Sequence, residues 1–521
     1  LGHGLRNWSR VLWSKQLDLF CPDGNASFVW DTSKKGLLTS ESATGVSKIY
    51  SYDNLARPTA VITNIDGTPY TVETEYDANY GRPKALRYPN NLTIALEYNS
   101  IGYLAAEKNA ATGYVYRTVT NQDDFGNISA ATLTNGQLTG SYLHSQRTGQ
   151  MLSNRVTKAA ANIHYLDYED YDSYGNIKKQ NNLLTAINST DSFEYDELHR
   201  ITDSSSSGSG FSHAIDYAYD AVGNILKKSD YSANDNGAYR YVTGTNRLQS
   251  VNLIDGSQAT FGYDAKGNQT HRNGVEEVEY NVFNKPISID RLDSQVSLDY
   301  DANWARYKQT RVVEGKTITT HYIDKLYEVE FEGSTTKASS YISDVAILVE
   351  NAAGASIRFT HKDRLGSSAT FTDHNGQVTA FRSYDPFGKP KMGSGDLMSS
   401  LSMRARLGNN LADMDQATRR GFTDHEHLDE VEIIHMNGRV YDYNVGRFMG
   451  VDPFIQEVGN SQGINPYSYV MNNPLGYTDP TGYSAHQAGS ICKDNDGSQC
   501  GTAFGWRKSG QELANKNNEK K

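Results

Sequence analysis

Two aspartate-proline pairs, Asp452-Pro453 and Asp479-Pro480, are the residues of this chain best suited to catalysis. Proline pushes the residue before it into extended geometry, so each aspartate occupies a stiff corner that can aim its carboxylate. Two carboxylates a few ångströms apart in a dry site cannot both ionise, and one can then act as general acid and the other as general base on a water molecule. Such pairs also simply begin turns, so the spacing alone leaves both interpretations open.

A degenerate repeat upstream supplies the elements that must position these aspartates. Its unit is tyrosine, aspartate, a few residues, glycine, and then asparagine or arginine, recurring at about two dozen residues. The clearest copies begin at Tyr76-Asp77, Tyr171-Asp172, Tyr219-Asp220 and Tyr263-Asp264, and weaker ones at Tyr52, Tyr98, Tyr195, Tyr280 and Tyr300.

Each repeat predicts a strand ending at Tyr-Asp, a turn in which Asp bonds the backbone and Gly supplies a positive φ, and a second strand. One hairpin cannot bury its own face, so the repeats should pair edge to edge in a long, spiralling antiparallel sheet. The tyrosines are expected to form packing ladders and no ligand platform. The fold class is therefore all-β.

Segments between the repeats refine this prediction. Residues 317–323 and 329–331 have the β-branched and aromatic bias of strands. The clearest helix signal is residues 399–411, which Gly408 keeps short. The serine-rich run 204–210 is predicted to be a flexible loop that tolerates cleavage.

Composition narrows the class of protein further. Hydrophobic residues make up 37 % of the 521 residues and Tyr outnumbers Phe by 35 to 16, which favours a thin β-structure with two wet surfaces over a large compact core. The net charge of -11 argues against a shell that grips nucleic acid. The sequence contains no run of 18 apolar residues, so it predicts no membrane-spanning helix. The chain starts at Leu1 without a signal peptide, so we expect a piece of a longer polypeptide.

Three cysteines, Cys21, Cys492 and Cys500, are too few for a disulfide framework. Cys492 and Cys500 could pair after export or remain free thiols. His425-Glu426-His427 would place two imidazoles on one face of a strand, a possible edge of a metal site. Without a third ligand we prefer a buried, hydrogen-bonded role and expect no metal and no cofactor.

The stretch 437–483 resembles the C-terminal core signature of the rearrangement-hotspot (Rhs) family, which includes the C subunits of insecticidal Tc toxins and is related to the YD shell of teneurins. The matching elements are Asn437-Gly438-Arg439, Tyr441-Asp442, Gly446-Arg447-Phe448, Asp452-Pro453, Asn465 to Pro474, and Asp479-Pro480-Thr481-Gly482-Tyr483. Upstream, residues 421–429, 361–367 and 384–388 resemble further family elements, and with the repeats the resemblance covers at least half the chain.

The resemblance implies three parts: a hollow YD-repeat β-shell over 1–345, an Rhs-associated core domain with an inward plug over 346–483, and the start of a variable C-terminal toxin or tail over 484–521. It also implies autoproteolysis by Asp452 and Asp479 between Tyr483 and Ser484.

Two departures from the family pattern affect the expected site. Phe454-Ile455 follows the first Asp-Pro where Ile-Gly is commoner, and Val451 stands where some Tc C subunits have arginine. The nearest basic residue, Arg447, is therefore the candidate for an orienting charge.

We expect a toxin carrier that encapsulates its own C-terminal toxin segment and frees it by self-cleavage. The alternatives are a teneurin-like adhesion shell without protease activity and an inert structural repeat protein. The resemblance also implies a secretion spike or a Tc B-type subunit as partner, an immunity protein, and synthesis in a bacterial cytoplasm followed by delivery outside the cell.

Overall fold

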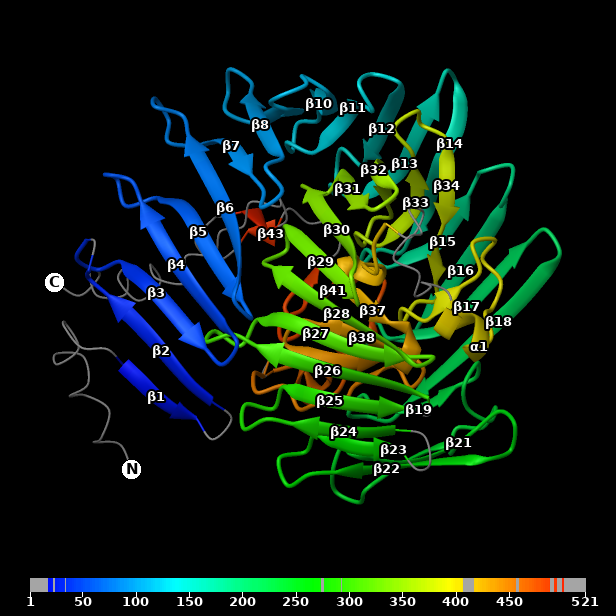
Figure 1. Ribbon diagram of the computed structural model, residues 1–521. Coiled ribbons are helices and arrows are strands. Elements are labelled where there is room, and N and C mark those ends of the chain that lie inside the picture. Colours follow the sequence, from blue (N-terminus) through cyan, green and yellow to red (C-terminus); the bar gives the residue numbers. More distant parts are fainter. Residues whose placement is uncertain are drawn as a thin grey trace, which may run out of the picture.

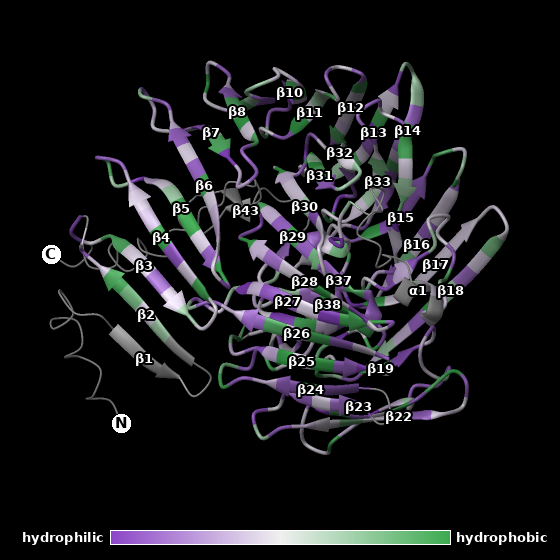
Figure 2. Cartoon of the chain, viewed as in Figure 1, coloured by the Kyte–Doolittle hydropathy of each residue, from purple (hydrophilic) through white to green (hydrophobic). Residues whose placement is uncertain are grey.

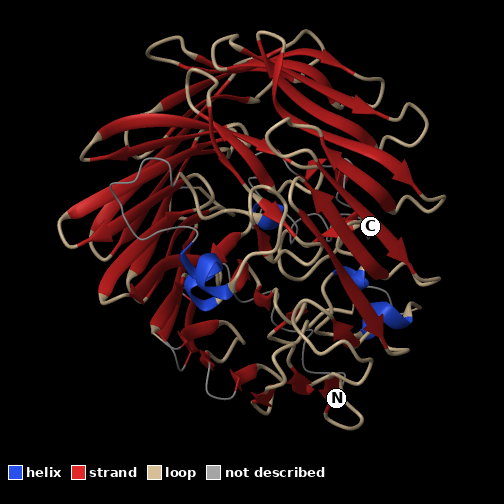
Figure 3. Ribbon diagram, turned by 90° about the vertical axis from the view of Figure 1, so that its right-hand side faces the viewer, coloured by secondary structure: helices blue, strands red, loops and turns tan. Residues whose placement is uncertain are grey.

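Two large antiparallel sheets make up a hollow shell around a C-terminal plug in the computed structural model (Figures 1 and 3). The structure describes residues 17–21, 24–32, 34–272, 276–291, 293–405, 417–455, 459–487, 492–493 and 499–500. Within each sheet every strand pairs with the next one in the chain, so the wall consists of two meanders, one from β1 to β19 and one from β20 to β34. The predicted all-β, spiralling architecture is confirmed.

The first sheet contains the strands β1 Leu17–Cys21, β2 Gly24–Trp30, β3 Leu38–Ala43, β4 Val46–Tyr52, β5 Pro58–Ile65, β6 Thr68–Tyr76, β7 Pro83–Arg87, β8 Thr93–Tyr98, β9 Leu104–Asn109, β10 Val115–Gln122, β11 Ile128–Leu133, β12 Leu138–His144, β13 Met151–Lys158, β14 Ala161–Tyr171, β15 Ile177–Asn182, β16 Ser189–Tyr195, β17 Ile201–Gly208, β18 Phe211–Tyr219 and β19 Ile225–Lys228.

The second sheet contains the strands β20 Tyr239–Tyr241, β21 Leu248–Asn252, β22 Gln258–Tyr263, β23 Gln269–Arg272, β24 Glu276–Tyr280, β25 Pro286–Arg291, β26 Ser294–Tyr300, β27 Arg306–Val313, β28 Lys316–Ile323, β29 Tyr327–Glu332, β30 Thr335–Ile342, β31 Ala346–Asn351, β32 Gly354–Lys362, β33 Ser368–Thr372 and β34 Val378–Phe381. The strands predicted at 317–323 and 329–331 are β28 and β29.

The repeat turns have the predicted chemistry. Asp220 accepts backbone N–H bonds from Val222 at 3.0 Å and from Asn224 at 2.8 Å, and Gly223 has a φ of +78°. The N–H groups left unpaired by the turn are thus satisfied by the aspartate side chain.

The repeat tyrosines join one repeat to the next. Each hydroxyl donates to the carbonyl of the first residue of the preceding strand, at 2.6 to 2.8 Å, in Tyr52, Tyr76, Tyr98, Tyr171, Tyr195, Tyr219, Tyr241 and Tyr300. The strand register also shifts directly before these tyrosines, as between Glu75 and Tyr76. Such bulges bend a strand and increase its twist, so their recurrence curves the sheet into a spiral.

Burial alternates along the strands, as in β27, whose residues are alternately half-buried and buried. Hydrophobic and hydrophilic segments accordingly mix along the strands in Figure 2. One hydrophobic core lies where the rim of the first sheet meets the second sheet, and includes Val46, Ile65, Leu326 and Val345. We call this contact the seam.

The plug, residues 417–487, lies inside the shell, where Figure 1 draws it in orange and red. Its folded part is a four-stranded sheet of β37 Glu426–Leu428, β38 Ile433–Met436, β39 Arg439–Asp442 and β40 Arg447–Phe448, with the 3-10 turns η1 Phe422–Asp424, η2 Asp429–Val431, η3 Ser461–Ile464 and η4 Val470–Asn472 and the pair β41 Tyr477–Thr478 and β42 His486–Gln487. The strand pairs β35 Ser383–Tyr384 with β36 Pro390–Lys391, and β43 Cys492–Lys493 with β44 Gln499–Cys500, complete the β-structure that is described.

The serine-rich run was wrongly predicted to be a loop. Residues 204–208 belong to β17, which pairs with β16 and β18, and Gly210 forms the hairpin turn with a φ of +85°. Ser204 and Ser206 are buried, and the Ser206 hydroxyl donates to Asp191. Backbone pairing needs no particular side chain, so two flanking strands can order a low-complexity segment.

The predicted short helix is present as α1 Ser400–Ala405, while residues 406–411 of that prediction lie outside the described part. The second sheet continues across the predicted 345/346 boundary as β30 and β31, and the three-part division stays a prediction. Among the described residues no helix is both long and apolar enough to cross a membrane.

Candidate functional site: two aspartates and an arginine in the plug

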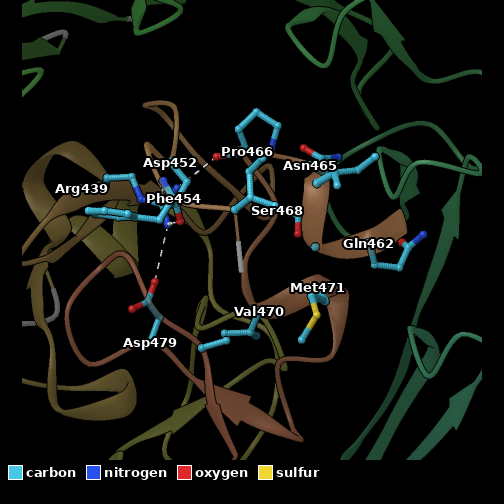
Figure 4. A pocket seen from close by; sticks show the side chains of 14 residues that line it. Arg439, Asp452, Phe454, Gln462, Asn465, Pro466, Ser468, Val470, Met471 and Asp479 are labelled. Atoms are coloured by element: carbon cyan, nitrogen blue, oxygen red, sulfur yellow. Dashed lines mark hydrogen bonds and ion pairs between the residues drawn. The ribbon is translucent and has the colours of Figure 1, made fainter. Parts of the chain in front are cut away.

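One arginine links the two predicted aspartates. Arg439 Nη2 lies 2.9 Å from Asp452 Oδ2 and 3.6 Å from Asp479 Oδ2. The three side chains are labelled in Figure 4. Arg439 and Asp479 are buried, and the Asp452 side chain is 9 % exposed. The positive charge between the carboxylates offsets the repulsion that would otherwise keep them apart.

A tight hairpin positions this arginine. Met436 and Arg439 pair across the turn between β38 and β39, where Asn437 has a φ of +59° and Gly438 follows. The guanidinium then donates to two backbone carbonyls, from Nη1 to Pro466 at 3.0 Å and from Nε to Gly482. It also stacks over the Phe448 ring at 3.6 Å. Burial lowers the pKa of Arg439, and the two aspartates oppose this shift.

Both aspartates occupy the stiff turns that their prolines predict. Asp452 Oδ1 accepts the Phe454 N–H at 2.9 Å, and the Asp452 N–H donates to the Pro466 carbonyl at 2.9 Å. Asp479 Oδ1 accepts the N–H groups of Tyr483 and Ser484, each at 2.9 Å. The carboxylate of Asp479 therefore contacts the nitrogen of the bond that the sequence predicts to be cut.

The Tyr483–Ser484 bond lies in the loop between β41 and β42, which pair antiparallel. Gly482 turns this loop with a φ of +76°, and a Cβ there would lie 2.1 Å from the Met436 carbonyl oxygen. The Tyr483 hydroxyl donates to the Gly438 carbonyl at 2.8 Å, and its ring meets the Phe454 ring edge-on at 6.0 Å. Contacts on both sides, from the β38–β39 hairpin and from the Phe454 ring, thus fix the position of the Tyr483–Ser484 bond. We call this arrangement the clamp.

A cavity of ≈ 40 Å³ borders the site and is lined by Arg439, Asp452, Pro466, Asp479 and Ala485 (Figure 4). By the same measure a water molecule needs about 10–15 Å³, so water fits beside both carboxylates.

Arg447 lies elsewhere. Its guanidinium donates to Tyr241 Oη at 2.9 Å, to Asn224 Oδ1 at 3.2 Å and to the Asn246 carbonyl at 2.6 Å, all on the shell wall. In the part of the chain that the structure describes, neither Asp452 nor Asp479 is among its partners. Arg439 was part of the Asn-Gly-Arg signal in the sequence, but nothing there gave it a role.

The His425-Glu426-His427 segment is a hydrogen-bonded part of the plug. His425 Nδ1 lies 2.9 Å from Thr423 Oγ1, and His427 Nε2 accepts the Phe422 N–H at 3.0 Å. Burial lowers the pKa of His425 to about 4. The described residues contain no group of three His, Cys, Asp or Glu side chains that could hold a metal ion.

Comparison with known proteins decides the family. A sequence model of the teneurin YD shell matches residues 27–475. The chain belongs to this family. Curated relatives of this YD-shell protein include the toxin subunit YenC1 of Yersinia entomophaga, 22 % identical over 299 residues that cover 51 % of this chain and 28 % of the relative. The tRNA nuclease WapA of Bacillus subtilis is 22 % identical over 276 residues, covering 52 % of this chain and 11 % of WapA. The chain thus spans about a tenth to a quarter of these relatives' lengths.

Solved structures share the YD-shell fold. The TcdB2-TccC3-TEV crystal structure has a TM-score of 0.70 at 14 % identity, covering 88 % of this chain and 25 % of that one. The Photorhabdus luminescens Tc holotoxin pore with the mutation TccC3-D651A has a TM-score of 0.68 at 14 % identity, covering 92 % and 25 %.

Proposed function

We propose that this chain is the shell and plug of a toxin carrier that cuts itself once between Tyr483 and Ser484. The contact between Asp479 Oδ1 and the Ser484 N–H carries this proposal, because it places an acid-base group 2.9 Å from the leaving nitrogen. The clamped loop supports it, since positioning supplies a large share of catalytic rate.

The proposed reaction is hydrolysis of one peptide bond. Asp452 takes a proton from water as the water oxygen adds to the Tyr483 carbonyl carbon. The proton that Asp452 has taken from water then passes through Asp479, whose Oδ1 lies 2.9 Å from the Ser484 nitrogen, to that nitrogen as the carbon–nitrogen bond breaks, so both carboxylates end ionised. Arg439 contacts the two carboxylates and the Gly482 carbonyl, and is a positioning residue in this scheme.

Residues 484–521 would then be the start of the cargo, released from the covalent chain but enclosed by the shell. A cytotoxic segment kept in a cavity is shielded from the producing cell. The similarity to TccC3, which is named in the structure of a Tc holotoxin pore, and to the toxin subunit YenC1 supports a B-type subunit or a secretion spike as partner and delivery from a bacterial cell. An immunity protein against the cargo is part of the same proposal. The adhesion shell without protease activity is the alternative.

Intact-mass spectrometry of freshly made protein tests the cleavage. The wild type should yield fragments ending at Tyr483 and starting at Ser484. Asp452→Asn and Asp479→Asn should each stay uncut while circular dichroism shows an unchanged fold, because asparagine keeps the shape and loses the acid-base function. Cleavage in both variants, or a folded wild type that stays whole, would favour the adhesion shell.

A further inference from the structure

Lys285 is a buried lysine of the shell wall that points into the plug. It lies in the repeat turn between β24 and β25 and is 7 % exposed. Its Nζ donates to the Gly438 carbonyl at 3.0 Å and lies 5.1 Å from the centre of the Tyr483 ring. Among the described residues no carboxylate lies within ion-pair distance of this ammonium group. A buried charge without a counter-ion is costly, so it indicates a role beyond stability.

Comparison with other repeat turns shows why this lysine is free to reach the plug. At the same turn position Arg57 pairs with Asp53 and Arg200 pairs with Asp196, at 2.6 and 2.7 Å. In the turn of Lys285 the aspartate is replaced by Asn281, which still accepts the backbone N–H groups of Phe283 and Lys285 at 3.0 Å. The turn therefore keeps its shape but has no carboxylate to hold the cation.

The Gly438 carbonyl connects Lys285 to the candidate scissile bond. It accepts from Lys285 Nζ at 3.0 Å and from the Tyr483 hydroxyl at 2.8 Å. The Gly438 N–H donates to the Thr481 carbonyl at 2.8 Å, so the same residue holds the loop on both sides. A Cβ on Gly438 would lie 2.4 Å from the Tyr483 ring, which shows how closely the two fit.

We propose that Lys285 is a positioning residue by which the shell wall controls self-cleavage. The Tyr483–Ser484 bond is cut only when the β24–β25 turn has packed against the plug and fixed the positions of Gly438 and Tyr483. This inference rests on the proposed self-cleavage. It adds a regulatory contact from the wall, more than 150 residues upstream of the aspartates, so that cleavage reports that the wall has assembled.

The charge state of Lys285 gives the proposal a pH signature. Burial, and then the nearby Arg439, lower the pKa of Lys285 to about 8. The charged and titratable groups that face it are Arg439 on β39, His435 on β38 and Tyr483 after β41. Because the ammonium loses its proton as pH rises through this range, its contribution to the cleavage rate should fade between pH 7 and 9.

Cell-free synthesis of the full 521-residue chain, pulse-labelled and then shifted to buffers of pH 7, 8 and 9, allows cleavage to be timed. Lys285→Met should slow cleavage at pH 7 by about tenfold or more, since small misplacement of reacting groups has large effects on rate. The wild-type to Lys285→Met rate ratio should fall toward one at pH 9. Arg57→Met removes the matched cation from another turn and should cleave within about twofold of wild type.

Asn281→Asp keeps the lysine but restores the carboxylate that other turns use to hold it, so it should also slow cleavage. If Lys285→Met fails to fold, the cleavage rate of Asn281→Asp still tests whether Lys285 controls self-cleavage. Wild-type rates in folded Lys285→Met or in Asn281→Asp would overturn this role of Lys285. A wild type that stays whole, or an Asp452→Asn variant that cuts, would instead show that the proposed cleavage itself is wrong.

Discussion

At the scale of single residues, Arg439 is the side chain on which the geometry of the candidate site depends. Its three nitrogens reach Asp452, the Pro466 carbonyl and the Gly482 carbonyl, and Nη2 also approaches Asp479. A planar fork of donors can hold several acceptors in fixed directions, which a lysine ammonium cannot do.

Arg439→Lys should therefore slow self-cleavage by roughly 100-fold, because it keeps a charge near the aspartates but loses the fixed fork. Arg447→Lys is the matched control, since the hydrogen bonds described for the Arg447 guanidinium go to wall residues and to neither aspartate, and it should cleave within about threefold of wild type. The fraction cut over time, read by intact mass, measures both. The opposite pattern would return the orienting role to Arg447, where the sequence predicted it.

Gly482→Ala should abolish cleavage. The residue has a φ of +76°, which alanine rarely adopts, and the new Cβ would meet the Met436 carbonyl oxygen at 2.1 Å. The loop must then leave the hairpin and carry the Tyr483–Ser484 bond away from Asp479. Gly36→Ala, at a φ of +84° with open space around it, controls for strain alone. Equal cleavage in both variants would contradict the clamp.

Local chemistry explains what the sequence could predict about this site. The two Asp-Pro corners follow from proline sterics, and both aspartates do lie beside one cavity. The partner arginine was not predictable from proximity in sequence, because the hairpin at Gly438 brings Arg439 thirteen residues back to Asp452 while Arg447, only five residues away, extends to the wall. Lys285 was still less visible, since its role depends on the closure of the whole shell.

At the scale of elements, the seam contains buried histidines that make it sensitive to acid. His164 on β14 and His361 on β32 lie with ring centres 5.9 Å apart, bonded to Thr370 and Thr372. Burial lowers the pKa of His164 to about 3 and of His361 to about 4. Among the described residues, their hydrogen-bond partners are these two hydroxyls and neither imidazole forms an ion pair.

Acid should therefore weaken the fold. The unfolded chain binds a proton at each histidine below about pH 6.5, and the folded chain does not until about pH 4, so stability is full above pH 6.5 and falls as pH drops toward 4. Each histidine should contribute about 2 kcal/mol of lost stability between pH 7 and 5. His361→Gln should show a smaller difference in urea midpoint between these pH values. His374 is exposed, so the urea midpoint of His374→Gln should depend on pH as in wild type. If the midpoint of wild type changed with pH as little as that of His361→Gln, buried His361 would not be the source of the acid sensitivity.

Element types were predicted well where a repeat defined them and poorly where composition misled. The Tyr-Asp turns appear with the expected aspartate bonds and glycine φ values because those residues determine local geometry. The serine-rich segment became strand β17 because its neighbours supply pairing partners on both sides, a tertiary effect that no local pattern contains.

At the scale of the whole molecule, the two meandering sheets make the shell a thin wall that contacts the plug through hydrophobic clusters and through buried ion pairs. Arg272 reaches Asp442, and Arg291 reaches Glu432. Small-angle scattering of the purified chain should show a particle larger than a solid sphere of 57.8 kDa, and circular dichroism should show a β-rich spectrum. A solid-globule profile or a largely helical spectrum would contradict the shell.

Within each of the two sheets, the pairing of consecutive strands has a consequence for how the protein is made. Contacts between consecutive strands need only short loops to close, so each hairpin can add to the growing edge as the ribosome delivers it. The plug is synthesised after the wall, so its arginine and aspartates follow every wall strand. The order of synthesis would therefore delay self-cleavage until after the wall has folded.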